Sequence, residues 1–153
     1  MPDDIFRFGN LFFFAFVVGT YTFEWIVVTA ALKGLPIERA AQFHDALFHH
    51  LPNRFMPWAG ALGGTSAIIL IILDNQSGTS EAFYVAGAVP ALSSAVITFT
   101  LSRRIDLQIG ALLPNPDPAE YGRLRRRWDR LISIRAPMGQ IGFACYVLAT
   151  LTV

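Results

Sequence analysis

The chain has little cysteine and little charge. Cys145 is the only cysteine among 153 residues, so the chain cannot form an internal disulfide or a cluster of thiolate metal ligands. Charged residues make up 15 % of the sequence and hydrophobic residues 54 %, whereas soluble domains carry about 25 % charged residues. The apolar residues gather in blocks separated by polar segments instead of recurring at the periods of a soluble core. This pattern favours an integral membrane protein.

Lysine is also nearly absent. Lys33 is the only lysine, whereas the chain has eleven arginines, seven of which lie between positions 103 and 130. A basic cluster can indicate nucleic-acid binding. The apolar segments on both sides of this one indicate the cytoplasmic face of a membrane instead, where Lys and Arg accumulate in loops. The opposite side carries only Arg7. We therefore predict a lipid bilayer and no nucleic acid as partner, with both termini outside the cytoplasm.

The apolar blocks predict an all-α fold, a single membrane domain over residues 1–153 with four transmembrane helices. The first block is long enough to cross a hydrocarbon core of about 30 Å at about 1.5 Å per residue. The acidic start of the chain lacks the basic region and cleavage site of a signal peptide, so we expect this block to be retained. The predicted spans cover about residues 6–32, 57–73, 82–101 and 131–153.

Two further features shape the predicted bundle. Residues 37–51 repeat apolar side chains at spacings of three and four behind Pro36, which predicts an amphipathic helix on the cytoplasmic side. In the second span, Gly60, Gly63 and Gly64 provide the small residues that let membrane helices pack closely. Such faces indicate a homo-oligomer or a subunit of a membrane complex.

Glu24 is the one carboxylate inside a predicted span. An ionisable group in hydrocarbon is costly, which makes it a candidate functional residue, and Tyr21 shares its helical face. The alternative is a structural ion pair with an arginine near the membrane interface, such as Arg135 or Arg54.

The histidines offer a second candidate. His44 lies on the buried face of the amphipathic helix, where an imidazole can act as general acid or base near neutral pH, or can simply be a buried, hydrogen-bonded side chain. The spacings among His44, His49 and His50 do not suit chelation from one helix. We therefore predict no metal and leave the cofactor unassigned, with a ligand set of His44, Asp45 and Glu24 as the alternative.

Several polar residues fall at one predicted membrane level, just under the cytoplasmic surface. Asn53, Arg54, Trp128 and Arg135 would form a polar pocket there. The segment 123–130 is typical of an arginine-rich helix that faces anionic lipid, with Trp128 at the interface. Alternatively, Arg135 holds an anion or an enolate-like substrate.

The stretch 115–135, in which Arg135 follows Trp128 by seven residues and leads into a last apolar helix, resembles the anthrone-oxygenase-like family of small four-helix membrane proteins. The segment Arg54-Phe-Met-Pro57 and the pair Phe99-Thr100 fit the same layout. Some fungal members are implicated in oxidising anthrones to anthraquinones without a conventional cofactor, and most bacterial members have no assigned activity. Trp128 and Arg135 match the family, whereas Ile132 stands where a histidine is common.

Two functions follow as expectations. The resemblance implies an oxidoreductase for an aromatic or quinol-like lipophilic substrate, with His44 as proton acceptor and Glu24 and Arg135 orienting or polarising the substrate. Its binding residues would be Tyr21, Asn53, Arg54 and Trp128. The second expectation is a non-catalytic accessory or scaffold subunit, which packs through its glycine-rich and phenylalanine-rich faces.

Overall fold

The structure is a computed structural model that describes residues 2–50, 52–73, 78–115 and 117–152. Within these ranges the chain is helical apart from short turns, and they contain no strand. The all-α prediction is therefore confirmed. The side chains of some helical residues, Asn53 and Arg54 among them, lie outside the described part.

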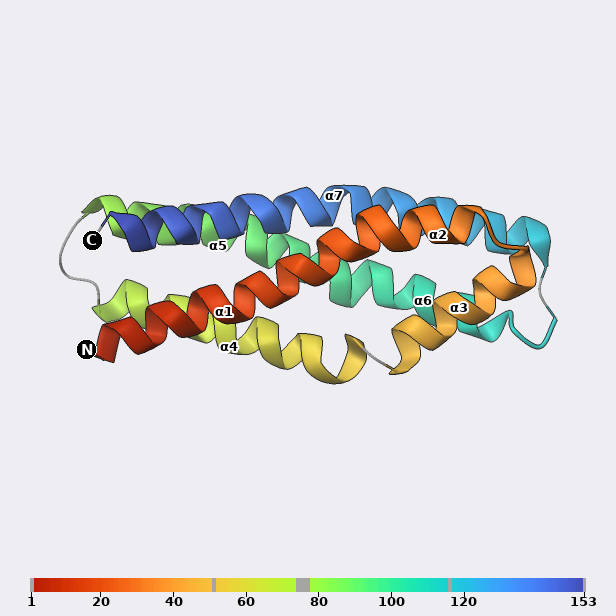
Figure 1. The fold of residues 1–153 in the computed structure, drawn as a ribbon, viewed down its shortest axis with the longest axis horizontal. Coiled ribbons are helices and arrows are strands. Elements are labelled where there is room, and N and C mark those ends of the chain that lie inside the picture. The colour runs from red at the N-terminus through yellow and green to blue at the C-terminus, as the bar shows by residue number, and fades with distance from the viewer. Residues whose placement is uncertain (1, 51, 74–77, 116, 153) are drawn as a thin grey trace.

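The chain runs along the long axis four times, as Figure 1 shows. Both termini lie at one end of the molecule, and the turn after Lys33 and the α6–α7 connection lie at the other. Two of the passes are continuous helices that include a π-helical turn, labelled η. In chain order the elements are α1 (Pro2–Phe23), η1 (Glu24–Val28), α2 (Thr29–Lys33), α3 (Ile37–His50), α4 (Pro52–Leu73), α5 (Gly78–Val96), η2 (Ile97–Ser102), α6 (Arg103–Ala111) and α7 (Pro118–Leu151).

Three helices are long and apolar enough to cross a membrane: Asp4–Lys33, Gly78–Ala111 and Pro118–Leu151. The α4 helix contains a shorter apolar stretch, Trp58–Ile72. The membrane character of the protein is thus supported, while the fourth span, the total of four and the orientation remain predictions. A helix of 34 residues is about 51 Å long, and a hydrocarbon core is about 30 Å thick, so α7 extends beyond the core.

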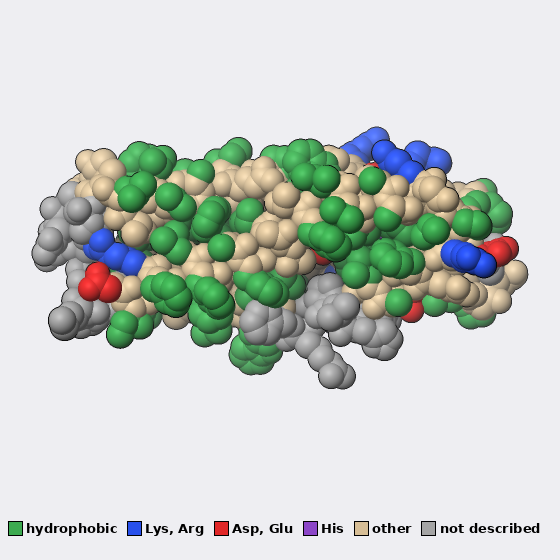
Figure 2. Space-filling view, in the orientation of Figure 1, with side chains coloured by type: hydrophobic (Ala, Val, Ile, Leu, Met, Phe, Trp, Pro, Cys, Tyr) green, Lys and Arg blue, Asp and Glu red, His purple; other side chains and the backbone are tan. Residues whose placement is uncertain are grey.

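The distribution of side chains on the surface agrees with a molecule whose middle part lies in a membrane. In Figure 2, most of the Lys and Arg side chains in view lie toward one end of the molecule and one small group lies at the other end, while hydrophobic side chains dominate the surface between them. Large apolar side chains are exposed along single helix faces, such as Phe8, Phe12 and Phe16 on α1. Apolar side chains exposed over the middle of a helical rod are stable in lipid and not in water.

Local signals place the start of α7. The Asp117 side chain accepts a hydrogen bond from the backbone N–H of Ala119 at 2.9 Å, and Pro118 occupies the first turn. The arginine-rich segment and the last predicted span are therefore one helix, as predicted. The third helical pass differs from the prediction, because it does not end near residue 101 but continues through η2 into α6.

Glycine allows two pairs of helices to approach closely. A Cβ atom added to Gly87 of α5 would lie 3.0 Å from the carbonyl oxygen of Gly142 of α7, and the reverse distance is also 3.0 Å. A Cβ atom on Gly63 of α4 would lie 2.9 Å from the ring of Phe14 on α1. The predicted close packing at the α4 glycines thus involves Gly63, whereas an added Cβ on Gly60 or Gly64 meets no atom within 4 Å.

Buried apolar side chains form a separate core at each end. The arginine-end core lies among α2, α3, α6 and the first half of α7, and the apolar-end core lies among α1, α4, α5 and the second half of α7. The arginine-end core contains Val28, Leu32, Ala40, Ala41, Phe48, Ile105, Ile109, Tyr121, Leu124, Trp128 and Ile132. The apolar-end core contains Phe14, Val18, Ala67, Leu70, Tyr84, Tyr146 and Ala149.

Candidate functional site

A buried ion pair lies between the two cores. Arg135, in the middle of α7, donates a hydrogen bond from Nη2 to the Glu24 carboxylate at the start of η1. Each residue is only 3 % exposed. Each of these buried charges needs the other, because burial of an isolated ion costs several kcal/mol of folding free energy. The alternative prediction of an ion pair between Glu24 and Arg135 is therefore confirmed.

Two further side chains complete the surroundings of Arg135. Its guanidinium carbon lies 4.8 Å from the centroid of the Tyr21 ring, which is a cation–π contact. Its Nη1 lies 3.5 Å from the Thr98 hydroxyl oxygen, and that hydroxyl lies 3.0 Å from the Tyr21 hydroxyl. Arg135 is thus held by a carboxylate, an aromatic face and a hydroxyl from two other helical passes.

The two π-helical turns lie at this site. Glu24 begins η1, and Thr98 lies within η2. A π-helical turn inserts one extra residue into a helix and is frequent at functional sites. In η1 the Thr29 hydroxyl donates to the Glu24 carbonyl oxygen, five residues back, at 3.2 Å. Both widened turns therefore contribute a polar side chain to the surroundings of Arg135.

A second polar pair lies on the arginine-end side. His44 Nε2 lies 3.0 Å from Asp106 Oδ1, which joins α3 to α6. The His44 ring is fully buried and contacts the rings of Phe48 and Trp128, at centroid distances of 4.6 Å and 5.1 Å. Asp106 is partly exposed. The predicted burial of His44 is confirmed.

Trp128 lies in the core and not at the membrane surface. It is 1 % exposed, and the guanidinium carbon of Arg125 lies 4.6 Å from its ring centroid. The expectation that Trp128 faces the lipid interface is therefore wrong. The space between α3 and α7 needs a large side chain, and Trp128 fills it against His44 and Phe48.

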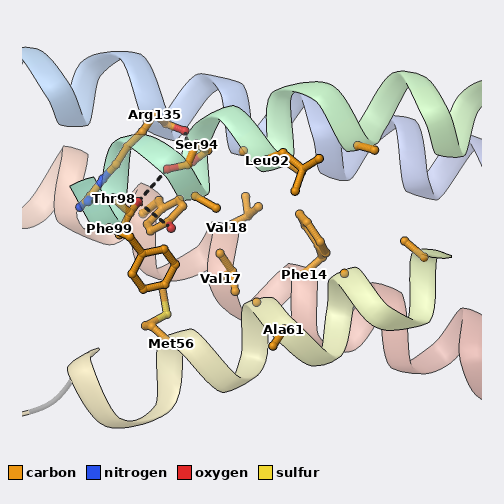
Figure 3. Close-up of a pocket in the computed structure, with 18 of the residues that line it drawn as sticks. Phe14, Val17, Val18, Met56, Ala61, Leu92, Ser94, Thr98, Phe99 and Arg135 are labelled. Carbon is orange, nitrogen blue, oxygen red and sulfur yellow. Dashed lines mark hydrogen bonds between the residues drawn. The ribbon is translucent and has the colours of Figure 1, made fainter. Parts of the chain in front are cut away.

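A cavity of about 380 Å³ is lined by both the Glu24–Arg135 pair and Asp106, and Figure 3 shows side chains that line it. Its walls come mainly from α1, α4 and α5 and are mostly apolar, with small residues such as Gly60, Gly64, Ala88 and Ala95. Two lining side chains, Ile68 and Leu92, are also exposed on the outer surface, so the cavity can be reached from the side of the bundle. One end is polar and is lined by Tyr21, Glu24, Thr98, Arg103, Asp106 and Arg135.

The structure brings together part of the predicted site. Tyr21, Glu24 and Arg135 line the cavity, whereas His44 lies behind Asp106 and does not. Trp128 contacts His44 and not the cavity. The side chains of Asn53, Arg54, His49 and His50 lie outside the described residues, so their predicted roles remain predictions.

The sequence interpretation missed the polar residues of the third pass. Ser94, Thr98, Ser102 and Asp106 recur every four residues, and Ser94 donates a hydrogen bond to the Arg135 carbonyl oxygen at 3.1 Å. This spacing indicates a polar helix face, but the face extends past residue 101, where hydropathy predicts that the span ends. Asp106 lies beyond that predicted end, so the hydropathy pattern leaves Glu24 as the one carboxylate inside a predicted span, whereas the structure places Asp106 in α6 beside His44.

The alternative metal ligand set is not assembled. Among the described residues no group of three or more His, Cys, Asp or Glu side chains could hold a metal ion. His44 pairs with Asp106, while Asp45 lies against Gly110, where an added Cβ would lie 2.6 Å from Oδ1 of Asp45. Adjacent residues on a helix point about 100° apart, so His44 and Asp45 meet different neighbours.

No family model, no curated protein sequence and no solved structure matches this chain.

Proposed function

We propose that this protein binds a lipophilic aromatic or quinol-like molecule in the cavity and oxidises it, in the manner that its resemblance to anthrone oxygenases implies. The observation that carries the proposal is the size and chemistry of the cavity. It has a volume of about 380 Å³ and apolar walls, and its polar end is lined by Arg135, Glu24 and Asp106. Ligand pockets in proteins fall between about 300 and 1,000 Å³ and combine apolar walls with a few polar groups.

The polar end supplies the two functions that such an oxidation needs. A base must remove a proton from an acidic carbon or phenol, and a positive group must stabilise the resulting oxyanion. Asp106 faces the cavity and is hydrogen-bonded to His44, so this pair is the proposed proton acceptor, with His44 in support. Arg135 and Arg103 provide the positive charge.

The proposed reaction uses dioxygen as the oxidant. For an anthrone, the ring CH₂ group becomes a carbonyl, one oxygen atom of O₂ enters that carbonyl, and the other leaves as water with the two hydrogens of the CH₂ group. Removal of the first proton gives an enolate whose electrons pass to O₂. The chain contributes the base, the positive charge and an apolar site that holds the rings.

The test compares two glycine substitutions in lipid nanodiscs. Gly64→Leu adds a side chain at the cavity wall, whereas Gly19→Leu adds the same side chain at an exposed position of α1 outside the cavity; at neither glycine does an added Cβ meet an atom within 4 Å. We expect oxygen uptake and anthraquinone absorbance with an anthrone substrate for the wild type and Gly19→Leu, and at least a tenfold loss for Gly64→Leu.

Two outcomes would count against the proposal. Equal turnover in Gly64→Leu and the wild type would mean that the substrate does not occupy the cavity. The second is that the wild type binds the anthrone but does not oxidise it, and that Asp106→Asn binds the anthrone equally well. The cavity would then be a binding site, and the protein would not be an oxidoreductase for this substrate.

The second candidate function is a non-catalytic subunit of a membrane complex or homo-oligomer. The observation in its favour is the exposed aromatic face of α1, where Phe8, Phe12 and Phe16 follow each other every four residues and the Phe8 and Phe12 rings stack at 5.7 Å. Gentle purification from native membranes and mass spectrometry tests it. A stoichiometric protein partner supports this function, and a chain that elutes alone in detergent opposes it.

A further inference from the structure

A second hollow, of about 360 Å³, lies on the outer surface between α6 and α7. It is separate from the cavity between α4 and α5 and shares no lining residue with it. Three of its lining residues are arginines from two helices, and the remainder are apolar apart from one amide. The lining residues are Leu101, Arg104, Ile105, Gln108, Arg127, Arg130 and Leu131.

None of the three arginines makes a hydrogen bond or an ion pair within the described part of the chain. Arg127 acts only through its charge on the Glu120 carboxylate, whose hydrogen-bond partner is Arg123. The acids of α6 and α7 are held elsewhere: Asp106 by His44, Asp129 by Arg125 and Glu120 by Arg123. Like charges that converge on one hollow repel each other, and a bound anion removes that repulsion. Guanidinium groups suit phosphate because they donate paired hydrogen bonds.

The apolar wall indicates that the anion belongs to a lipid. Leu101 is followed by Ser102, Arg103 and Arg104, and Leu131 is preceded by Arg130, so on both walls of the hollow apolar residues give way to basic ones. This change is expected where a hydrocarbon core meets the headgroups. Leu101 is also exposed on the outer surface. A dissolved phosphate ion would gain nothing from Leu101 and Leu131, whereas the first carbons of an acyl chain would.

We infer that this hollow binds an anionic phospholipid. Its phosphate contacts Arg104, Arg127 and Arg130, and the start of its acyl chain lies against Leu101 and Leu131. Basic pockets between membrane helices are known sites for such headgroups. Because residues of η2 and α6 form one wall and residues of α7 the other, a bound lipid joins these helices.

The experiment is native mass spectrometry of the full chain in a neutral detergent, with added phosphatidylglycerol or phosphatidylcholine. A neutral micelle has no surface charge, so a retained lipid reports a site and not general attraction. We expect one phosphatidylglycerol per chain and no comparable retention of phosphatidylcholine. Equal retention of the two lipids would overturn the inference, because the arginines would then not select the headgroup.

A matched pair of variants locates the site. Arg127→Gln/Arg130→Gln removes two charges from the hollow, and Arg123→Gln/Arg126→Gln removes two charges at the same spacing on the same helix outside it. All four side chains are exposed, so we expect both variants to fold. The apparent affinity for phosphatidylglycerol should fall about tenfold or more in the first variant and change less than about twofold in the second.

Two results would contradict the lipid site. Equal losses in the two variants would show diffuse attraction to the whole arginine-rich helix. Binding of inorganic phosphate at the same affinity, with displacement of the lipid, would show a site for dissolved phosphate. If Arg127→Gln/Arg130→Gln does not fold, Arg104→Gln on the other helix tests the same hollow, and unchanged lipid retention there would also overturn the inference.

Discussion

The contacts of α6 with α3 and α7 and the contact between α4 and α5 are made by side chains of different size. At the arginine end, Trp128, Phe48 and Ile109 fill the space between α3, α6 and α7. In the apolar half, α4 and α5 face each other through glycine and alanine, and the cavity of about 380 Å³ remains. The difference shows that the cavity follows from side-chain volume, because both ends are built from the same four helical passes.

Small residues have opposite effects within the apolar half. Gly87 and Gly142 have no side chains, so the backbones of α5 and α7 approach closely there and leave no open space between them. Gly60 and Gly64 leave open space on α4. A glycine-rich helix therefore indicates either close packing or a cavity, and the neighbouring helix decides which one forms.

The largest effect should come from breaking the ion pair between the two ends. Arg135→Met leaves the Glu24 carboxylate buried without its cation, and loss of one partner of a buried pair costs about 3–5 kcal/mol of unfolding free energy. Unfolding in mixed detergent, followed by circular dichroism, measures this loss. The double variant Glu24→Met/Arg135→Met should recover most of it. If the double variant is as unstable as Arg135→Met, the unpaired charge is not the cause.

A pair of apolar truncations tests the contrast in packing. Ile109→Ala removes a fully buried side chain of the arginine-end core and should cost about 2–5 kcal/mol. Leu92→Ala removes a side chain that lines the cavity and is largely exposed, so it should cost less than about 1 kcal/mol. The same unfolding measurement compares them. Equal costs would mean that the apolar half is packed as tightly as the arginine end.

Two adjacent glycines separate close contact from open space. Gly63→Leu places a side chain against the Phe14 ring and should cost about 1–3 kcal/mol through overpacking. Gly64→Leu enters the cavity and should change stability by about 0.5 kcal/mol or less. The midpoints of thermal unfolding in nanodiscs compare the two variants. A larger loss for Gly64→Leu would place the open space on the other side of α4.

The smallest effect concerns the pair that joins α3 to α6. Asp106→Ala removes the hydrogen-bond partner of buried His44 Nε2 and should cost about 1–2 kcal/mol. Asp106→Asn keeps a hydrogen-bonding group at the same place and should lose less. Hydrogen exchange of α3 measures the local effect, and equal protection in Asp106→Ala and the wild type would argue that the pair does not stabilise this end.

Part of the site could be predicted from the sequence. An ionisable residue in an apolar helix is conspicuous, which identified Glu24, and the face spacing added Tyr21 and His44. Asp106 and Thr98 were missed because the predicted third span ended near residue 101, where polar residues begin. The helix continues there because η2 and α6 pack on α7 and α3, and tertiary contacts of this kind cannot be inferred from hydropathy.

The sequence by itself determined that the chain is helical, where its apolar segments lie and where α7 begins. Hydropathy, proline and glycine positions and the Asp117 cap act within a few residues, so a local pattern is sufficient to predict them. The sequence offered Arg135 as one of two partners for Glu24, and the tertiary structure selected it. Only the tertiary structure decided that Asp106 meets His44 and that a cavity opens between α4 and α5. These features depend on how each helix is rotated toward its neighbours, and that rotation is set by packing among side chains far apart in the chain.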